Sequence, residues 1–196
     1  LMRVISSLCI SCGSSKPQPR HQEQADALAD ILVRHGIDMV YGGARAGLMG
    51  FTADAVLSRG GRVIGIIPEY LDKYEIGHTG VTKLHIVANM HVRKMMMFDS
   101  SDAFLVFPGG YGTMDEMFEM LTWRQLAMHD KPIIVVNVDG YWDPLVTLLD
   151  HIVQQGYAKP ETKNLLHIIP DVSQMMGLFK TMSPPDPSPP KVWLQA

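Results

Sequence analysis

Short apolar runs alternate along the chain with segments in which apolar residues recur every three or four positions. Continuous runs such as Phe104 to Phe107 are typical of strands buried on both faces of a sheet. Segments such as Ala25 to Val33 have helical spacing, and Gly36 is expected to end that helix. The alternation predicts an α/β fold, a Rossmann-like, doubly wound parallel sheet of about seven strands with helices on both faces.

The expected strands each end at a glycine, a proline or a polar turn. They are Arg3 to Ile10, Asp38 to Tyr41, Arg62 to Ile67, Lys83 to Val87, Phe104 to Phe107, Ile133 to Val138 and Leu166 to Ile169. Between two of them, Glu69 to Thr82 is polar and has no clear period, so we expect a mobile loop over the site. Asp143, followed by a proline, is expected to cap a helix that ends near Gly156.

A change of composition marks the end of the predicted domain. A helix over Val172 to Met182 completes a single nucleotide-binding domain spanning 1–182. The next eight residues, Ser183 to Pro190, hold five prolines, which is typical of an extended polyproline-like segment. We therefore expect a proline-rich C-terminal tail over 183–196.

A glycine-rich turn follows the apolar run that ends at Phe107. Pro108 stops sheet pairing, and the glycines of segment 109–112 permit positive φ. Thr113 and Glu116 fit a Thr-x-x-Glu capping box, so the following helix is expected to begin at Thr113. The free backbone N–H groups of the loop and the positive end of the helix then converge on one spot, as in phosphate sites of open α/β sheets.

Two further turns follow predicted strands. Cys12 to Ser15 is a small polar turn that offers amides and hydroxyls to a ligand. Tyr41 to Gly50 runs through several glycines into a helix, but it has neither the G-x-G-x-x-G spacing of a dinucleotide site nor the Gly-Lys-Ser/Thr of a P-loop. Tight packing between helix and strand is the competing explanation for such glycines, and both interpretations remain open.

An arginine lies on an otherwise apolar helical face. Asn89 to Asp99 is predicted as a helix with Met90, Arg93 and Met97 on one side. Such an arginine needs an anionic partner, unless its charged end reaches solvent at the rim of a methionine-rich core. Both alternatives are consistent with the sequence.

Composition narrows the function classes. The chain has 196 residues, 46% of them apolar and 19% charged, as in a soluble globular protein. Its formal net charge of −3 gives no electrostatic basis for nucleic acid as a partner. The sequence lacks both a run of about 18 apolar residues and a basic segment followed by an apolar signal region, so a cytoplasmic protein that binds no membrane is expected.

Two cysteines, Cys9 and Cys12, form a Cys-x-x-Cys motif. This motif occurs in redox sites and as half of a zinc site, but no second pair is present in the sequence. At the end of an apolar strand, cysteine more often serves as a small buried hydrophobe. The sequence contains no convincing set of metal ligands, and we expect neither a metal nor a cofactor.

Four motifs together identify a family resemblance. They are Ser11-Cys-Gly-Ser-Ser15, Tyr41-Gly-Gly…Gly-Leu-Met-Gly50, Met90-His-Val-Arg-Lys94 and Pro108-Gly-Gly-Tyr-Gly-Thr-x-x-Glu116. Their residues, order and spacing resemble the LONELY GUY (LOG) family of cytokinin-activating phosphoribohydrolases, over roughly Val4 to Phe179. The chain departs from the family pattern at Ala44, where a third glycine is usual.

The resemblance implies an enzyme that hydrolyses the N-glycosidic bond of adenosine 5′-monophosphate, or its N6-modified forms, to free base and ribose 5-phosphate. It implies a catalytic pair, Arg93 and Glu116. It also implies a set of substrate-binding positions: Ser14, Gly43, Met90, Lys94, Gly109, Gly110, Tyr111, Gly112 and Thr113. Members have often been labelled lysine decarboxylases, a label that these motifs do not support.

Glycosidic cleavage suits the predicted residues on chemical grounds. The reaction passes through an oxocarbenium-like ribose, which a nearby carboxylate stabilises while it positions water. Glu116 fits this role, with the 5′-phosphate on the glycine-rich loop and with Arg93 and Lys94 supplying positive charge. The helix-capping role of Glu116 is the competing explanation for a glutamate at this position.

Other functions and assemblies remain open at this point. Similar glycine-loop folds occur in non-catalytic carriers, such as molybdenum-cofactor carrier-like proteins, which bind a phosphorylated ligand without cleaving it. A nicotinamide-dependent oxidoreductase is disfavoured because the fingerprint is absent. The resemblance and an apolar helix suggest a homodimer, although core packing alone also explains that helix. Its apolar residues are Met114, Met117, Phe118, Leu121 and Trp123.

Overall fold

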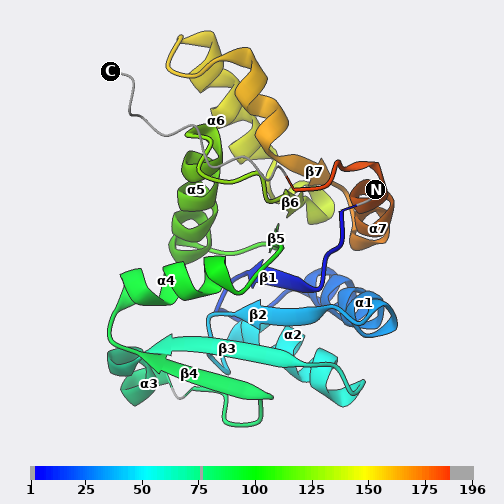
Figure 1. The fold of residues 1–196 in the computed structure, drawn as a ribbon, viewed down its shortest axis with the longest axis vertical. Coiled ribbons are helices and arrows are strands. Elements are labelled where there is room, and N and C mark those ends of the chain that lie inside the picture. The colour runs from blue at the N-terminus through cyan, green and yellow to red at the C-terminus, as the bar shows by residue number, and fades with distance from the viewer. Residues whose placement is uncertain (1–2, 76, 186–196) are drawn as a thin grey trace.

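The computed structural model describes residues 3–75 and 77–185, and these form a seven-stranded parallel sheet (Figure 1). The strand order is β4-β3-β2-β1-β5-β6-β7. The strands are β1 (Ser7–Ser11), β2 (Asp38–Tyr41), β3 (Val63–Pro68), β4 (Lys83–Val87), β5 (Ala103–Val106), β6 (Ile133–Val136) and β7 (His167–Ile169). The predicted doubly wound α/β class and the number of strands are confirmed.

The first strand is shorter than the sequence predicts. Pairing begins at Ser7, which lies opposite Asp38 of β2, so Arg3 lies outside the sheet. The Arg3 side chain is buried and donates a hydrogen bond of 2.7 Å to the backbone oxygen of Asp130. A buried cation therefore occupies the position where sequence pattern places the start of a strand.

Alternate side chains of each strand enter two separate apolar cores. In β5, Leu105 packs on one face, while Phe104 and Val106 pack on the other. Helices α1 (Pro19–His35), α2 (Gly47–Ser58) and α7 (Met175–Thr181) contribute to the first core. Helices α4 (Met90–Asp99), α5 (Tyr111–Gln125) and α6 (Asp143–Gln154) contribute to the second. Both faces are covered, which explains why the strands read as unbroken apolar runs.

The segment expected to be a mobile loop contains a helix, α3 (Glu69–Glu75). Beyond it, Gly77 forms an antiparallel bridge with Ala44, and the His78 amide donates a hydrogen bond of 2.8 Å to the Gly43 oxygen. Sequence pattern misses this arrangement because its partners lie more than 30 residues apart and pair through the backbone. The segment therefore supports the loop after β2.

The capping box predicted at Thr113 is wrong. Helix α5 begins at Tyr111, and Gly110 is its N-cap, with an extended φ of −97° and ψ of −150°. Thr113 is thus inside the first turn and buried, and no side chain caps this helix end. Because Gly110 supplies the extended N-cap conformation three residues before Thr113, Glu116 is free of a capping role.

Smaller differences occur near the C-terminus. The N-cap of α6 is Trp142 and not the expected Asp143, which is the first residue of the helix. The expected last helix is divided into a 3₁₀ turn, η3 (Val172–Gln174), and α7. Two further 3₁₀ segments, η1 (Val138–Gly140) and η2 (Pro160–Leu165), flank α6. Residues 186–196 of the expected tail lie outside the described residues, so the division at 182 stays a prediction. Among the helices described, none is long and apolar enough to cross a membrane.

The strand order fixes where a ligand can bind. From β1 the chain proceeds through β2 and β3 to β4, then returns to the other side of β1 as β5. Parallel strands β1 and β5 are direct neighbours, with Cys9 opposite Phe104. In open α/β sheets, the crevice outside the carboxyl ends of two such strands is the usual ligand site.

Candidate active site

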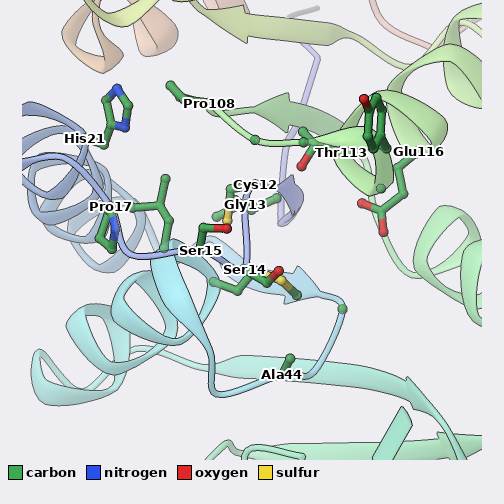
Figure 2. A pocket seen from close by; sticks show the side chains of 18 of the residues that line it. Cys12, Gly13, Ser14, Ser15, Pro17, His21, Ala44, Pro108, Thr113 and Glu116 are labelled. Atoms are coloured by element: carbon green, nitrogen blue, oxygen red, sulfur yellow. The ribbon is translucent and has the colours of Figure 1, made fainter. Parts of the chain in front are cut away.

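A cavity of about 650 Å³ lies at this switch point. It is bounded by the segments that follow β1, β2 and β5, by the first turns of α4 and α5, and by Tyr141 after β6. Figure 2 shows Glu116 and His21 at opposite ends of this cavity, with Ser14 and Ser15 between them. The cavity is thus an elongated site of the size typical for small-molecule binding.

The glycine-rich loop presents a row of free backbone donors to this cavity. In the part of the chain that the structure describes, none of the amides from Gly109 to Thr113 donates a hydrogen bond to another protein group. The loop carbonyls, in contrast, are occupied: those of Pro108 and Gly110 accept from the amides of Gly13 (3.0 Å) and Met114 (3.1 Å). Successive free amides at a helix N-terminus form an anion-binding nest.

Close backbone packing explains one glycine of this loop. A Cβ added at Gly109 would lie 2.1 Å from Oγ1 of Thr113 and 2.8 Å from the amide nitrogen of Gly13. Since real Cβ atoms do not approach so closely, only glycine allows the loops after β1 and β5 to meet. The two loops therefore form a single wall of the cavity.

Arg93 is held in place by main-chain acceptors. Asn89 is the N-cap of α4: its side chain accepts a hydrogen bond from the Val92 amide, and this start directs Arg93 toward the sheet. Its Nε donates to the Ile66 oxygen (3.1 Å) and its Nη2 to the Gly42 oxygen (3.3 Å). Arg93 is only 7% exposed, so of the two alternatives raised by the sequence, the buried, partnered arginine is the one found.

Gly42 provides the space for this guanidinium. A Cβ at Gly42 would lie 1.7 Å from Nη2 of Arg93. At the next residue, Gly43, φ is +77°, a left-handed conformation that favours glycine. Both interpretations of the glycines after β2, a turn at a ligand site and a turn needed for tight packing, therefore hold, because the close packing at Gly42 positions the guanidinium of Arg93.

Glu116 faces Arg93 across the cavity wall. One oxygen, Oε1, lies 3.6 Å from Nη2 of Arg93, and the other, Oε2, accepts a hydrogen bond of 2.6 Å from the Ser11 hydroxyl. Burial raises the pKa of Glu116, whereas the positive charge of Arg93 and the Ser11 hydrogen bond act to lower this pKa. The site therefore holds a largely desolvated carboxyl group beside a fixed positive charge.

The structure places most of the predicted site residues on the cavity, but not all of them. Ser14, Met90 and every residue from Gly109 to Thr113 line it. Lys94 does not: its Nζ lies 3.1 Å from both Asp115 and Glu119, on the outer side of α5. Successive side chains on a helix point about 100° apart, which explains why Arg93 and Lys94 have different surroundings.

Gly43 also lies outside the cavity lining, whereas Gly42 and Ala44 belong to it. The backbone oxygen of Gly43 accepts a hydrogen bond from the His78 amide instead. The substitution of alanine for the usual glycine at position 44 therefore affects the cavity surface directly.

Several residues of the site were not among those predicted from sequence. Ser11 is the clearest case: it holds Glu116 from the end of β1, and the Ser11-Cys-Gly-Ser-Ser15 motif that it opens gives no sign of this partner. His21 and Tyr141 form the other end of the cavity, with their rings in an edge-on contact at 5.9 Å between centroids. Burial lowers the pKa of His21. These two residues come from different elements and belong to no common local motif.

The cysteines are buried apolar side chains. Cys9 and Cys12 are both free thiols, and burial raises the pKa of each far above its usual range. Such protonated thiols are poor nucleophiles and poor metal ligands. Within the described ranges, no group of three or more His, Cys, Asp or Glu side chains is arranged to hold a metal ion.

Comparison with known proteins places these motifs in a family. A family model described as "Possible lysine decarboxylase" matches residues 49–179. The chain is 40% identical over 178 residues to the cytokinin riboside 5′-monophosphate phosphoribohydrolase LOG3 of Arabidopsis thaliana, which covers 90% of this chain and 83% of that protein. The chain belongs to the LOG family. A second Arabidopsis thaliana protein, the cytokinin riboside 5′-monophosphate phosphoribohydrolase LOG7, is 39% identical over 178 residues, which cover 90% of this chain and 82% of that protein.

Solved structures of lower identity share the fold of this LOG protein. The molybdenum cofactor binding protein of Rippkaea orientalis is 19% identical, with a TM-score of 0.66 over 89% of this chain and 95% of that one. The Moco carrier protein of Chlamydomonas reinhardtii is 20% identical, with a TM-score of 0.64 over 89% and 94%. At these identities the likeness concerns the fold alone, whereas the 40% identity above concerns the family.

The Arg93 and Glu116 pair makes a testable contribution to stability. We expect Arg93→Met to lower the free energy of unfolding by about 3 kcal/mol, because it leaves a buried carboxylate without its cation. Without Arg93 the pKa of Glu116 rises further, and a folded state that binds more protons than the unfolded state loses stability as pH increases. Urea unfolding should therefore show a larger deficit at about pH 8 than at about pH 5.

A second substitution controls for lost packing. Adding Glu116→Gln to Arg93→Met removes the stranded charge, so part of the stability should return and the pH dependence of the deficit should disappear. A deficit that is the same at both pH values in the single variant would contradict this account of the pair.

Proposed function

We propose that this LOG protein hydrolyses the N-glycosidic bond of a purine nucleoside 5′-monophosphate, releasing the free base and ribose 5-phosphate. The observation that carries the proposal is the position of Glu116: a buried carboxyl group beside Arg93, at one end of a cavity whose wall is a row of free amides. The names of relatives about 40% identical to this chain support the same reaction.

The free amides of segment 109–113 are the proposed binding site of the 5′-phosphate. They supply donors without a mobile side chain, and the positive end of α5 favours a negative group at the same place. Lys94 is engaged with Asp115 and Glu119, so the phosphate depends on main-chain donors rather than on that lysine. A phosphate held there fixes the attached ribose, which converts binding energy into positioning.

Glu116 is the proposed catalytic carboxylate. As the bond between C1′ and the base nitrogen breaks, its electron pair leaves with the base and positive charge develops on the ribose. A carboxylate in a site with little water stabilises that charge strongly. The water that Glu116 positions then adds its oxygen to C1′. One of its protons passes to the carboxylate and on to the leaving base, and the other remains on the new hydroxyl of the ribose.

Arg93 is proposed to keep Glu116 ionised and correctly oriented. Burial alone favours the protonated acid, which can neither stabilise the ribose cation nor accept a proton from water. The guanidinium 3.6 Å away opposes that effect, and two backbone oxygens prevent it from moving. Ser11 restricts the other carboxylate oxygen in the same way.

The proposed substrates are adenosine 5′-monophosphate and N6-modified forms of it. The relatives named above carry cytokinin riboside 5′-monophosphate in their names, which supports an N6-substituted base. The cavity, at about 650 Å³, accommodates a ligand of that class. A panel of nucleotides assayed for release of base would define the preference.

Chromatography of a reaction with adenosine 5′-monophosphate tests the proposal. We expect free adenine and ribose 5-phosphate from the native protein, and a loss of at least about 100-fold in turnover for Glu116→Gln. Glutamine still accepts the Ser11 hydrogen bond, so the fold should persist. Asp115→Asn is the matched control, since that carboxylate pairs with Lys94 outside the cavity.

Two results would refute the assignment. Near-normal turnover by Glu116→Gln would remove the catalytic role of this residue. Protection of the native protein against thermal unfolding by the nucleotide, without release of base, would indicate a non-catalytic carrier like the proteins that share its fold.

The pH dependence of turnover provides a second test of Glu116. Since burial raises its pKa, kcat/KM should fall on the acid side at a higher pH than an unperturbed glutamate would give. Ser11→Ala removes an interaction that lowers this pKa, so the acid limb should move to still higher pH in that variant. An acid limb that Ser11→Ala leaves unmoved would contradict the role of the hydrogen bond.

We also propose a homodimer that uses the outer face of α5. Met117, one of the apolar residues expected there, is buried at 1% exposure and belongs to the core. An open groove of about 590 Å³ remains on this helix, lined in part by Met114, Phe118 and Trp123. Apolar side chains around an open groove favour association with a second apolar surface.

Phe118→Glu tests the dimer. A charge in the groove should abolish association, because it would be buried without a partner, and light scattering after gel filtration should then give half the native mass. Leu148→Glu, on the exposed side of α6, is the control and should leave the mass unchanged. A native protein that is already monomeric would refute the proposal.

A further inference from the structure

The side chain of Tyr141 is hydrogen-bonded to the backbone of the glycine-rich loop. The hydroxyl of Tyr141 donates a hydrogen bond of 2.7 Å to the oxygen of Gly109. This oxygen belongs to the peptide unit between Gly109 and Gly110, whose N–H is one of the free amides described above. Tyr141 therefore acts on the anion-binding nest without being part of it.

The peptide unit in question has glycine on both sides, which favours a flip of its orientation. With glycine on both sides, a rotation of about 180° meets no Cβ, since glycine adopts positive and negative φ almost equally. In the flipped state the carbonyl oxygen of Gly109 would replace the N–H of Gly110 on the cavity side. A donor to the anion would become an acceptor that repels it.

The hydrogen bond from Tyr141 selects between these two states. In a trans peptide the C=O and N–H groups point in opposite directions. Holding the Gly109 oxygen toward Tyr141 therefore directs the Gly110 N–H away from Tyr141, and this N–H is one of the free donors.

The flanking carbonyls are held in a different manner. Those of Pro108 and Gly110 accept from backbone amides, of Gly13 and Met114, which no substitution other than proline removes. For the peptide between the two glycines, the donor is a side chain instead. This makes its orientation dependent on the residue at position 141.

Tyr141 is 44% exposed, and neighbouring groups restrict its backbone and its ring. Asn137 bridges the turn before it: its Oδ1 accepts from the Trp142 amide (2.6 Å), and its Nδ2 donates to Asp143 (2.8 Å). The Tyr141 ring packs edge-on against Trp142, with 4.9 Å between centroids, and against His21. A hydroxyl on a ring so constrained can hold its acceptor at little further cost in entropy.

We propose that Tyr141 is a positioning residue that sets the phosphate affinity of the glycine-rich loop by keeping the Gly109 to Gly110 peptide in its donor orientation. The inference rests on the proposed function in assigning the 5′-phosphate to this loop. It adds a residue from the β6 side of the cavity, which neither the loop motif nor the Arg93 and Glu116 pair includes.

Tyr141→Phe isolates the hydroxyl, because the ring and its packing remain. Calorimetry with ribose 5-phosphate should show about tenfold weaker binding, the effect of losing one hydrogen bond to a charged group. With adenosine 5′-monophosphate as substrate, KM should rise by a similar factor while kcat changes little, since the phosphate is held equally in the ground and transition states. Affinity for adenosine, which lacks the phosphate, should be unchanged.

The amide of Gly110 gives a direct signature. In a ¹⁵N-labelled native protein its resonance should shift downfield on addition of ribose 5-phosphate, and this shift should be absent or reduced in Tyr141→Phe. Tyr157→Phe is the matched control, because Tyr157 is 88% exposed and lies outside the cavity lining. That variant should bind and turn over like the native protein.

The outcomes separate this inference from the proposed function. If the native protein binds ribose 5-phosphate but releases no base, the proposed hydrolase activity is refuted. The role of Tyr141 is then tested by the ribose 5-phosphate affinities alone. Equal ribose 5-phosphate affinity in native protein and Tyr141→Phe would overturn the inference, whatever the activity. So would an equal loss of adenosine affinity, which would place Tyr141 on the nucleoside, or a native protein that does not bind ribose 5-phosphate.

Discussion

The pairing of Arg93 with Glu116 is the constraint around which the cavity is built. Each group is largely removed from water, and an ionised side chain is buried at a large cost unless other groups compensate it. The compensation comes from five segments: the ends of β1 and β3, the turn after β2, and the two helices that carry the partners. These segments must all be in place before either charge is tolerated, so the pair ties the chemistry of the site to the completed sheet.

Glycine contributes to this site by leaving space as much as by allowing unusual backbone angles. At Gly42 the missing side chain leaves room for a guanidinium, and at Gly109 it lets two loops touch. The result is a cavity whose polar wall is mostly main chain. Main-chain donors are fixed by the fold and have little rotamer entropy to lose on binding, which suits recognition of an invariant group such as phosphate.

Much of the fold was predictable, because a sheet covered on both faces leaves a strong local signal. Continuous apolar runs such as that of β5 identify buried strands, and their alternation with helices specifies parallel pairing. The roles of Thr113 and Lys94 were not predictable. The Thr-x-x-Glu sequence is the same whether the helix begins at Thr113 or, as found, two residues earlier. The sequence also does not reveal that Lys94 pairs with Asp115 and Glu119 instead of lining the cavity. The role of Tyr141 could not be read from the sequence around it, because its partner is a backbone oxygen 32 residues away.

The cavity collects groups from Ile10 near the beginning of the chain to Tyr141 well past its middle. Any contiguous fragment of the domain therefore lacks part of the wall, and a growing chain has no complete binding site until the segment after β6 has been made. A ligand for this site binds only the finished fold, so it draws the folding equilibrium toward the native state in proportion to its own concentration. Cellular supply of the ligand and survival of the protein are thereby linked.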